Sequence, residues 1–273
     1  MTTRGDHALQ IVVALHSSGA SGRQWRSLGA ALEGTHSVVT PDLHGHGAGP
    51  AVPAAPATIV AADAELVARL VLAAPHGAHL VGHSYGAAVA LKVARRCPDQ
   101  VRSLSLVEPV AFRMLFDRYG RRRPAAEIHE MARVLHALVR TGRSDVAARQ
   151  FVKYWGGDDA WRRLGPDARA SVASRMHAIA AQFDALASDD ELTLDACRRI
   201  VAPTLLVAGT ATRAPALRIA ELVASALPGV RDERLPGGNH VEALESPARV
   251  VGRIARFVAE VDARTSTPLM KAA

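Results

Sequence analysis

Short apolar segments alternate with longer amphipathic ones along most of this chain, and that alternation limits its possible folds more than any other feature. The apolar segments are rich in Val, Leu and Ile, as expected of strands that are covered on both faces. They are predicted as strands over residues 8–15, 36–40, 78–82, 101–107 and 203–208, and the more charged residues 230–235 are predicted as an edge strand. Helices are predicted between them, over residues 22–33, 58–74, 85–96, 214–227 and 247–262. Alternating strands and helices form βαβ units, so the pattern predicts an α/β protein with a mostly parallel sheet.

One long block interrupts this alternation. Residues 111–196 contain no strand-like segment but several segments with helical periodicity. We interpret the block as an all-helical lid, inserted between two strands and covering the C-terminal edge of the sheet. The predicted organisation is therefore a core formed by residues 1–110 and 197–265, a helical lid over 111–196, and a flexible tail over 266–273.

A serine lies in a glycine-bounded turn between the third predicted strand and the helix that follows it. Residues 82–86 are Gly-His-Ser-Tyr-Gly, which matches the G-x-S-x-G pattern of a nucleophile elbow. In this strand–turn–helix context the flanking glycines prevent clashes, and the strained turn projects Ser84 Oγ at the sheet edge. The adjoining helix N-terminus favours developing negative charge. The pattern predicts that Ser84 is a nucleophile; an inert serine in a glycine-rich turn is the alternative.

On these residues the chain resembles the α/β-hydrolase superfamily, over nearly its whole length. Three further segments match that family in order: His16-Ser17-Ser18-Gly19 after the first strand, Asp42-Leu43-His44-Gly45-His46-Gly47 after the second, and Gly238-Asn239-His240 after the last. The resemblance implies an α/β-hydrolase fold. Members of the family usually begin with an additional β-hairpin, but only about eight residues precede the first strand here. We therefore expect a sheet without that hairpin, of about six strands, all parallel.

The resemblance also implies roles for several residues. His240 would be the base that activates Ser84, because serine is a weak nucleophile without one; a surface histidine is the alternative. The backbone N–H groups of Ser17 and Tyr85 would form an oxyanion hole. His16 and Trp155 are expected to contact the substrate, although lid aromatics more often pack against other helices.

The acid of the expected triad departs from the commonest family pattern. After the fifth predicted strand the family usually has G-x-x-D, but Thr212 stands at the acid's place here and cannot carry the required charge. Glu108 ends the preceding strand, where some members place their acid, so it is predicted to complete the triad. The following Pro109 favours an extended backbone at Glu108. The alternatives are a solvated or Arg-paired Glu108, an acid at Asp184 or within residues 189–191, and a dyad without acid.

Charge and motif content argue against other classes of protein. The formal charge is +7, and 30 of the 33 basic residues are Arg, which makes nucleic-acid binding worth testing. However, aromatic residues make up only 4% and no recognition motif is present, so no nucleic-acid partner is expected. The densest basic run, residues 118–123, could bring positive charge near an anionic substrate, or it could be a solvated helix end. The histidines at 44 and 46 lack a second ligand cluster and the glycine spacing does not fit a dinucleotide, so neither metal nor cofactor is expected.

The sequence also yields expectations about location and partners. Cys97 and Cys197 lie far apart and suggest no disulfide framework. The first residues do not resemble a signal peptide, and no apolar run reaches the roughly 18–20 residues of a membrane span. We therefore expect a cytoplasmic protein that acts on a small molecule and binds no membrane; a homodimer is left open.

Together these patterns predict a cofactor-independent serine hydrolase that cleaves an ester, thioester or lactone through an acyl-enzyme. The same residues could support C–C bond hydrolysis or haloperoxidase-like perhydrolase chemistry. A ligand-binding protein that retains the fold without catalysis is a third alternative, motivated by Thr212. The sequence does not identify the substrate, because a fold and a triad determine a reaction type and not an acyl group.

Overall fold

A six-stranded sheet forms the centre of the molecule in the computed structural model, which describes residues 9–266. Its order is β2-β1-β3-β4-β5-β6, and every neighbouring pair is parallel. The strands are β1 Gln10–Leu15, β2 His36–Val39, β3 Ala78–His83, β4 Val101–Val107, β5 Thr204–Gly209 and β6 Arg231–Leu235. The predicted α/β architecture and the all-parallel sheet of about six strands are confirmed.

Helices cover both faces of the sheet, because side chains of each central strand point alternately to opposite faces. In β1, Val13 and Leu15 belong to one apolar cluster, and Val12 and Ala14 belong to the other. The first cluster is completed by helices α2 Ile59–Leu72, α3 Tyr85–Arg96 and α11 Ala214–Ala226. The second is completed by α1 Arg26–Ala31 and α13 Pro247–Ser266, together with the short 3₁₀ turn Gly22–Trp25.

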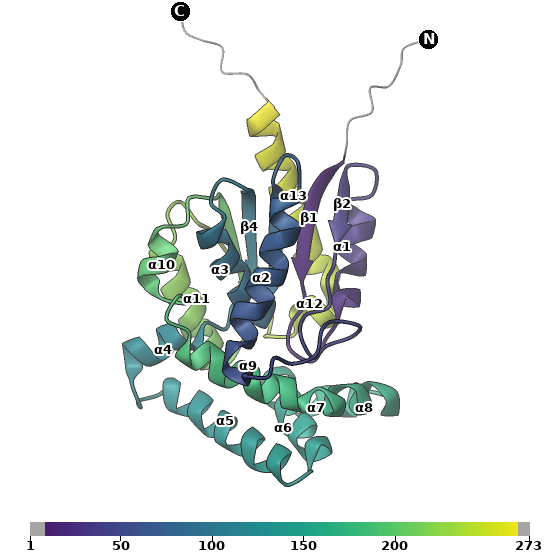
Figure 1. Cartoon of the computed structure of the whole chain (residues 1–273), viewed down its shortest axis with the longest axis vertical. Helices are drawn as coiled ribbons and strands as arrows, with labels where there is room; N and C mark the ends of the chain where they lie inside the picture. The colour runs from purple at the N-terminus through teal and green to yellow at the C-terminus, as the bar shows by residue number, and fades with distance from the viewer. Residues whose placement is uncertain (1–8, 267–273) are drawn as a thin grey trace, which may run out of the picture.

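The chain between β4 and β5 forms a series of helices joined by turns. It contains α4 Phe112–Tyr119, α5 Ala125–Arg140, α6 Ser144–Gly156, α7 Asp158–Arg163, α8 Pro166–Ser174, α9 Met176–Ser188 and α10 Leu194–Arg198. Figure 1 shows α4 to α9 at the end of the sheet towards which the strands point. Phe183 holds this layer together by packing against Phe112 and Phe151, with ring centroids 5.0 and 6.4 Å apart. The predicted lid end at residue 196 falls within α10, which packs on α3 and α11 of the core.

The remaining described segments connect this framework to the site. A 3₁₀ turn, Pro56–Thr58, precedes α2, and the short helix α12 Glu242–Glu245 precedes α13. Of the predicted tail, only residue 266 is described, as the last residue of α13; the rest lies outside the described residues. No helix in the described range, 9–266, is both long and apolar enough to cross a bilayer.

Candidate active site

Ser84 occupies a sharp turn between β3 and α3. Its φ of 54° and ψ of −114° lie outside the usual regions for a residue with a side chain, which is the strain expected of a nucleophile elbow. The turn is possible only because its neighbours are glycines. A Cβ at Gly82 would lie 2.4 Å from the carbonyl oxygen of Gly86, and a Cβ at Gly86 would lie 2.5 Å from that of Leu15. The G-x-S-x-G spacing is therefore a steric requirement of this turn.

Ser84, His240 and Glu108 come together at the C-terminal edge of the sheet, from three separate segments. Ser84 Oγ lies 2.9 Å from His240 Nε2, and His240 Nδ1 lies 3.2 Å from Glu108 Oε2. All three side chains are buried. A carboxylate can only accept at Nδ1, so the imidazole carries its proton there, and Nε2 can accept the proton of the Ser84 hydroxyl. The arrangement allows proton transfer from a serine to a histidine that a carboxylate orients.

Glu108 is held as a carboxylate by two donors besides the His240 ring. Gly209 N–H donates to its Oε1 at 2.6 Å, and the Thr212 hydroxyl donates to its Oε2 at 2.8 Å. Burial alone would raise the pKa of Glu108, but the His240 ring and these two donors outweigh it and lower the pKa. Thr212, at the position where the resembled family usually has an acid, thus donates to a carboxylate at the end of the neighbouring strand.

The backbone at Glu108 differs from the sequence prediction. Pro109 predicts an extended conformation there, whereas Glu108 has a φ of +48°. Within residues 9–266, Ser84 and Glu108 are the two non-glycine residues with positive φ. Such strain costs about 1–3 kcal/mol per residue and persists where the surrounding structure imposes it, most often at functional sites.

The expected oxyanion donor at Ser17 requires a correction. Ser17 N–H already donates to the side-chain oxygen of Gln24, at 3.0 Å. The N–H of the next residue, Ser18, has no acceptor among the described residues, and Ser18 lines the cavity at Ser84. Tyr85, the other predicted donor, is the first residue of α3, so its N–H lies in the turn where no helical carbonyl is available. The free pair of amides is therefore Ser18 with Tyr85.

A buried bridge of side chains that the sequence analysis missed connects the two loops of the site. Since burial lowers the pKa of His83 to about 3, its ring is neutral. His83 Nε2–H donates to the carbonyl of His240 at 2.8 Å, and its Nδ1 accepts from Gln24 Nε2 at 2.9 Å. Gln24 accepts in turn from Ser17. Nothing in the sequence marks this bridge except the position of His83 inside the serine turn.

Of His16 and Trp155, both expected to contact the substrate, only Trp155 lines the cavity. His16 is fully buried, does not line the cavity, and uses both ring nitrogens on backbone groups: Nδ1–H donates to the carbonyl of Ser17 at 2.8 Å, and Nε2 accepts from Leu43 N–H at 3.0 Å. The expectation that His16 contacts the substrate is therefore corrected: its buried ring holds the loop after β1 and has no nitrogen left for a ligand. Trp155 does line the cavity, and its ring lies against that of His240 with centroids 4.1 Å apart.

A cavity of about 520 Å³ opens above Ser84, between the core and the lid. Much of its wall is apolar; these residues include Phe151, Val152, Trp155, Leu164, Val172, Val241 and Leu244. Two cationic side chains, Arg23 and Arg175, also line it. The basic run at residues 118–123 contributes no side chain to this wall; within it, Arg123 lines a second cavity on the lid. Of the two readings of this run, the one that places its charge near an anionic substrate is therefore not supported, and the cations at the cavity come from Arg23 and Arg175.

His44 and His46, in the loop after β2, form hydrogen bonds with neighbouring groups. His44 Nδ1 pairs with Asp63 Oδ1 at 2.7 Å, and His46 Nε2 accepts from Gly19 N–H at 3.0 Å. These contacts hold the loop after β2 against α2 and against the loop after β1.

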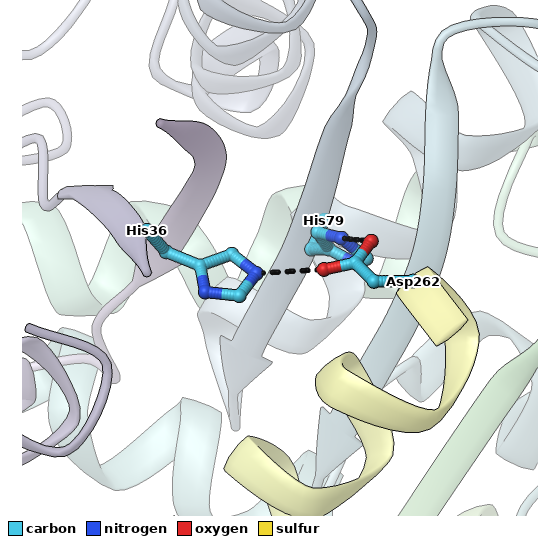
Figure 2. Close-up of side chains that lie close together, drawn as sticks. All are labelled: His36, His79 and Asp262. Atoms are coloured by element: carbon cyan, nitrogen blue, oxygen red, sulfur yellow. Dashed lines mark hydrogen bonds and ion pairs between the residues drawn. The ribbon is translucent and has the colours of Figure 1, made fainter. Parts of the chain in front are cut away.

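A different set of side chains approaches metal-ligand geometry at the opposite end of the sheet. His36, His79 and Asp262, from β2, β3 and α13, place their ligand atoms within 4.8 Å of one another (Figure 2). Each histidine Nε2 contacts one oxygen of Asp262, at 2.9 and 3.0 Å. Arg102 also donates to Asp262, at 2.7 Å, so a divalent cation bound here would lie against a guanidinium. The cluster fastens α13 to the N-terminal end of the sheet.

Comparisons with known proteins extend this description. The chain matches the alpha/beta hydrolase family over residues 12–253. Over 98 residues it is 40% identical to the lipase LipV of Mycobacterium tuberculosis. That match covers 36% of this chain and 36% of LipV, so the similarity spans about a third of the length of this curated relative.

Solved structures show the same fold. An enol-lactonase from Burkholderia xenovorans aligns with a TM-score of 0.73 and 21% identity, over 92% of each chain. MGS-M2, an alpha/beta hydrolase enzyme from a Medee basin deep-sea metagenome library, aligns with a TM-score of 0.78 and 15% identity, over 93% of this chain and 90% of that one. From the family match and this fold, the chain belongs to the alpha/beta hydrolase family.

Proposed function

We propose that this protein is a cofactor-independent serine hydrolase that cleaves an ester or a related acyl bond through Ser84, His240 and Glu108. One observation carries the proposal: Ser84 Oγ lies 2.9 Å from His240 Nε2, while the opposite ring nitrogen faces a buried carboxylate. The relative LipV is named as a lipase, which supports an acyl substrate.

The reaction follows from the donors and acceptors of the site. His240 Nε2 takes the hydroxyl proton as Ser84 Oγ attacks the carbonyl carbon, and Glu108 stabilises the resulting imidazolium. The amides of Ser18 and Tyr85 donate to the oxyanion of the tetrahedral intermediate. The imidazolium then protonates the leaving group, which departs and leaves an acyl-enzyme. A water molecule, deprotonated by the same histidine, hydrolyses that ester and restores Ser84.

The cavity favours a substrate with an apolar acyl portion. Its volume of about 520 Å³ is within the range of small-molecule sites, about 300–1,000 Å³. The Trp155 ring covers one face of His240, so it excludes water from the base on that side. An apolar chain that extends over Phe151 and Val172 would bury additional surface there.

A serine-directed fluorophosphonate and a panel of 4-nitrophenyl esters and lactones of graded chain length test the proposal. The wild-type protein should be labelled and should release 4-nitrophenolate, whereas Ser84→Ala should do neither. Ser171→Ala is the matched control, because Ser171 also lines the cavity but takes no part in the triad. Failure of the folded wild-type protein to label at Ser84 would exclude serine hydrolase chemistry.

A further inference from the structure

Arg175 presents a guanidinium to the cavity from the lid. It lies between α8 and α9 and is partly buried. Its Nη1 donates to the carbonyl oxygens of Gly19 and Ala20, at 2.6 and 3.0 Å, in the segment that follows β1. These two contacts fix the guanidinium beside the loop that carries the amide of Ser18. Its Nε and Nη2 groups have no acceptor among the described residues, so donors remain for a ligand.

The charge of Arg175 is not neutralised by direct contact. Within residues 9–266 no carboxylate lies within 4.0 Å of it. Asp42 is the acidic group that acts on it electrostatically, but the two Asp42 oxygens accept from the N–H groups of Gly22 and Ala48, each at 2.7 Å. Burial lowers the pKa of Arg175, as expected for a cation that has lost part of its hydration. A partly desolvated guanidinium with unused donors favours an anionic partner.

The other charged residues of the cavity wall also leave an excess of positive charge. Arg23 also lines it, is exposed, and has no ion-pair partner in the described part of the chain. Glu245 is the carboxylate of the lining residues, and Arg163 already pairs with it. The wall therefore combines an apolar surface with two cations whose charge is not matched by a free carboxylate.

We propose that Arg175, assisted by Arg23, forms an anion subsite, and that the substrate is an acyl compound carrying a carboxylate or phosphate group in addition to the scissile bond. This inference rests on the proposed hydrolase function and narrows its substrate class. The planar guanidinium suits either anion, because its parallel N–H groups match two oxygens at once. The apolar wall accommodates the chain that joins the anion to the reacting carbonyl.

The first test compares 4-nitrophenyl hydrogen adipate with 4-nitrophenyl methyl adipate, which differ mainly in one negative charge. We expect the wild-type protein to favour the charged ester in kcat/KM by about tenfold, the effect of one charge-assisted hydrogen bond. Arg175→Gln should remove that preference, because kcat/KM should fall about tenfold more for the charged ester than for the neutral one, and Arg23→Gln should reduce the preference in part. Arg140→Gln, at an exposed lid position outside the cavity wall, is the matched control and should retain it.

A second substrate pair tests whether the anion that the subsite binds is a phosphate and not a carboxylate. Butyryl-coenzyme A and the butyryl thioester of N-acetylcysteamine share the acyl group and thioester, but only the first carries phosphates. An Arg175-dependent preference in this pair assigns the anion to the leaving group, and one in the adipate pair assigns it to the acyl group. Absence of any such preference in both pairs overturns the subsite. Equal losses by Arg175→Gln on charged and neutral substrates also overturn it, because they indicate that the side chain only supports the loop.

Binding to Ser84→Ala separates this proposal from the hydrolase proposal. Calorimetry on this variant needs no turnover, so it tests the subsite even if the wild-type protein cleaves no ester. We expect the charged ligand of the pair to bind about tenfold more tightly than the neutral one, and adding Arg175→Gln should remove the difference. Equal affinities in both pairs would overturn the subsite whatever the activity of the wild-type protein.

Discussion

Replacing Glu108 with Gln is the most direct test of its proposed role as the acid of the triad. The side chain keeps its size, and its amide oxygen can still accept from Gly209 N–H, 2.6 Å from Oε1 in the native protein. The amide nitrogen would then face the Thr212 hydroxyl and His240 Nδ1, which lie 2.8 and 3.2 Å from Oε2. An NH₂ group at that place favours an imidazole whose proton is on Nε2. That tautomer cannot accept the Ser84 proton.

The expected loss follows from the geometry. A carboxylate and an imidazolium 3.2 Å apart attract each other by about 5 kcal/mol at an effective dielectric constant of about 20. Losing that stabilisation in the transition state lowers kcat by about several thousandfold, since each ~1.36 kcal/mol is tenfold in rate. The same size of effect is typical when a triad acid becomes an amide, about 10⁴ in kcat.

The assay is the initial rate of 4-nitrophenyl ester hydrolysis at saturating substrate, with thermal denaturation to confirm folding. Thr212→Val is the matched control: it removes one neutral hydrogen bond to the same carboxylate, so we expect a loss of about tenfold or less. Adding Thr212→Asp to Glu108→Gln should restore part of kcat, because the Thr212 Oγ lies 2.8 Å from the oxygen that contacts the histidine. If folded Glu108→Gln retained more than about a tenth of the wild-type kcat, the assignment of the acid would be refuted.

Three further predictions follow from buried polar groups. His83→Phe removes the hydrogen bonds from His83 to Gln24 and to the His240 carbonyl, so kcat should fall by about 10–100-fold at similar KM and similar melting temperature. An unchanged kcat would contradict a role for His83 in positioning the His240 loop. Burial lowers the pKa of His79 to about 4 and the pKa values of His46 and His83 to about 3, so below about pH 6.5 the unfolded chain binds more protons than the folded chain. The free energy of unfolding, measured with urea, should therefore fall as the pH is lowered from about 6.5 to 4. A flat profile over this range would contradict the prediction. Lys92→Met leaves the Asp189 carboxylate, 2.6 Å away in the native protein, without its buried partner and should cost about 3 kcal/mol in urea denaturation; a loss below about 1 kcal/mol would show that the pair contributes little.

Much of the fold could be predicted because its signals are local. Continuous apolar segments such as 78–82 and 203–208 specify buried strands, and the strand-free block specifies the helical insertion. The glycines around Ser84 are a local signal as well, since the turn leaves no room for a Cβ at either position. These features depend on neighbours within a few residues, so the sequence alone reveals them.

Ser84 is predicted from its glycine-bounded turn, and His240 and Glu108 from the resemblance to the α/β-hydrolase superfamily; the structure brings the three side chains together. Three other details could not be found in this way. The Ser17 N–H donates to the Gln24 side chain, and both ring nitrogens of His16 form hydrogen bonds with backbone groups. Glu108 adopts a positive φ despite the following proline. These details depend on how side chains and loops pack in three dimensions, which the sequence does not specify, although one of the two His16 contacts is made with the adjacent Ser17.

Periodicity and turn chemistry act over short distances, so the amino-acid sequence is enough to predict the architecture and the serine turn. The polar contacts of the site follow from the folded chain: the donors to Glu108, the amide left free at Ser18, and the position of the Arg175 guanidinium beside the cavity. Hydrogen bonds form over about 3 Å, so they depend on how segments distant in the chain pack together.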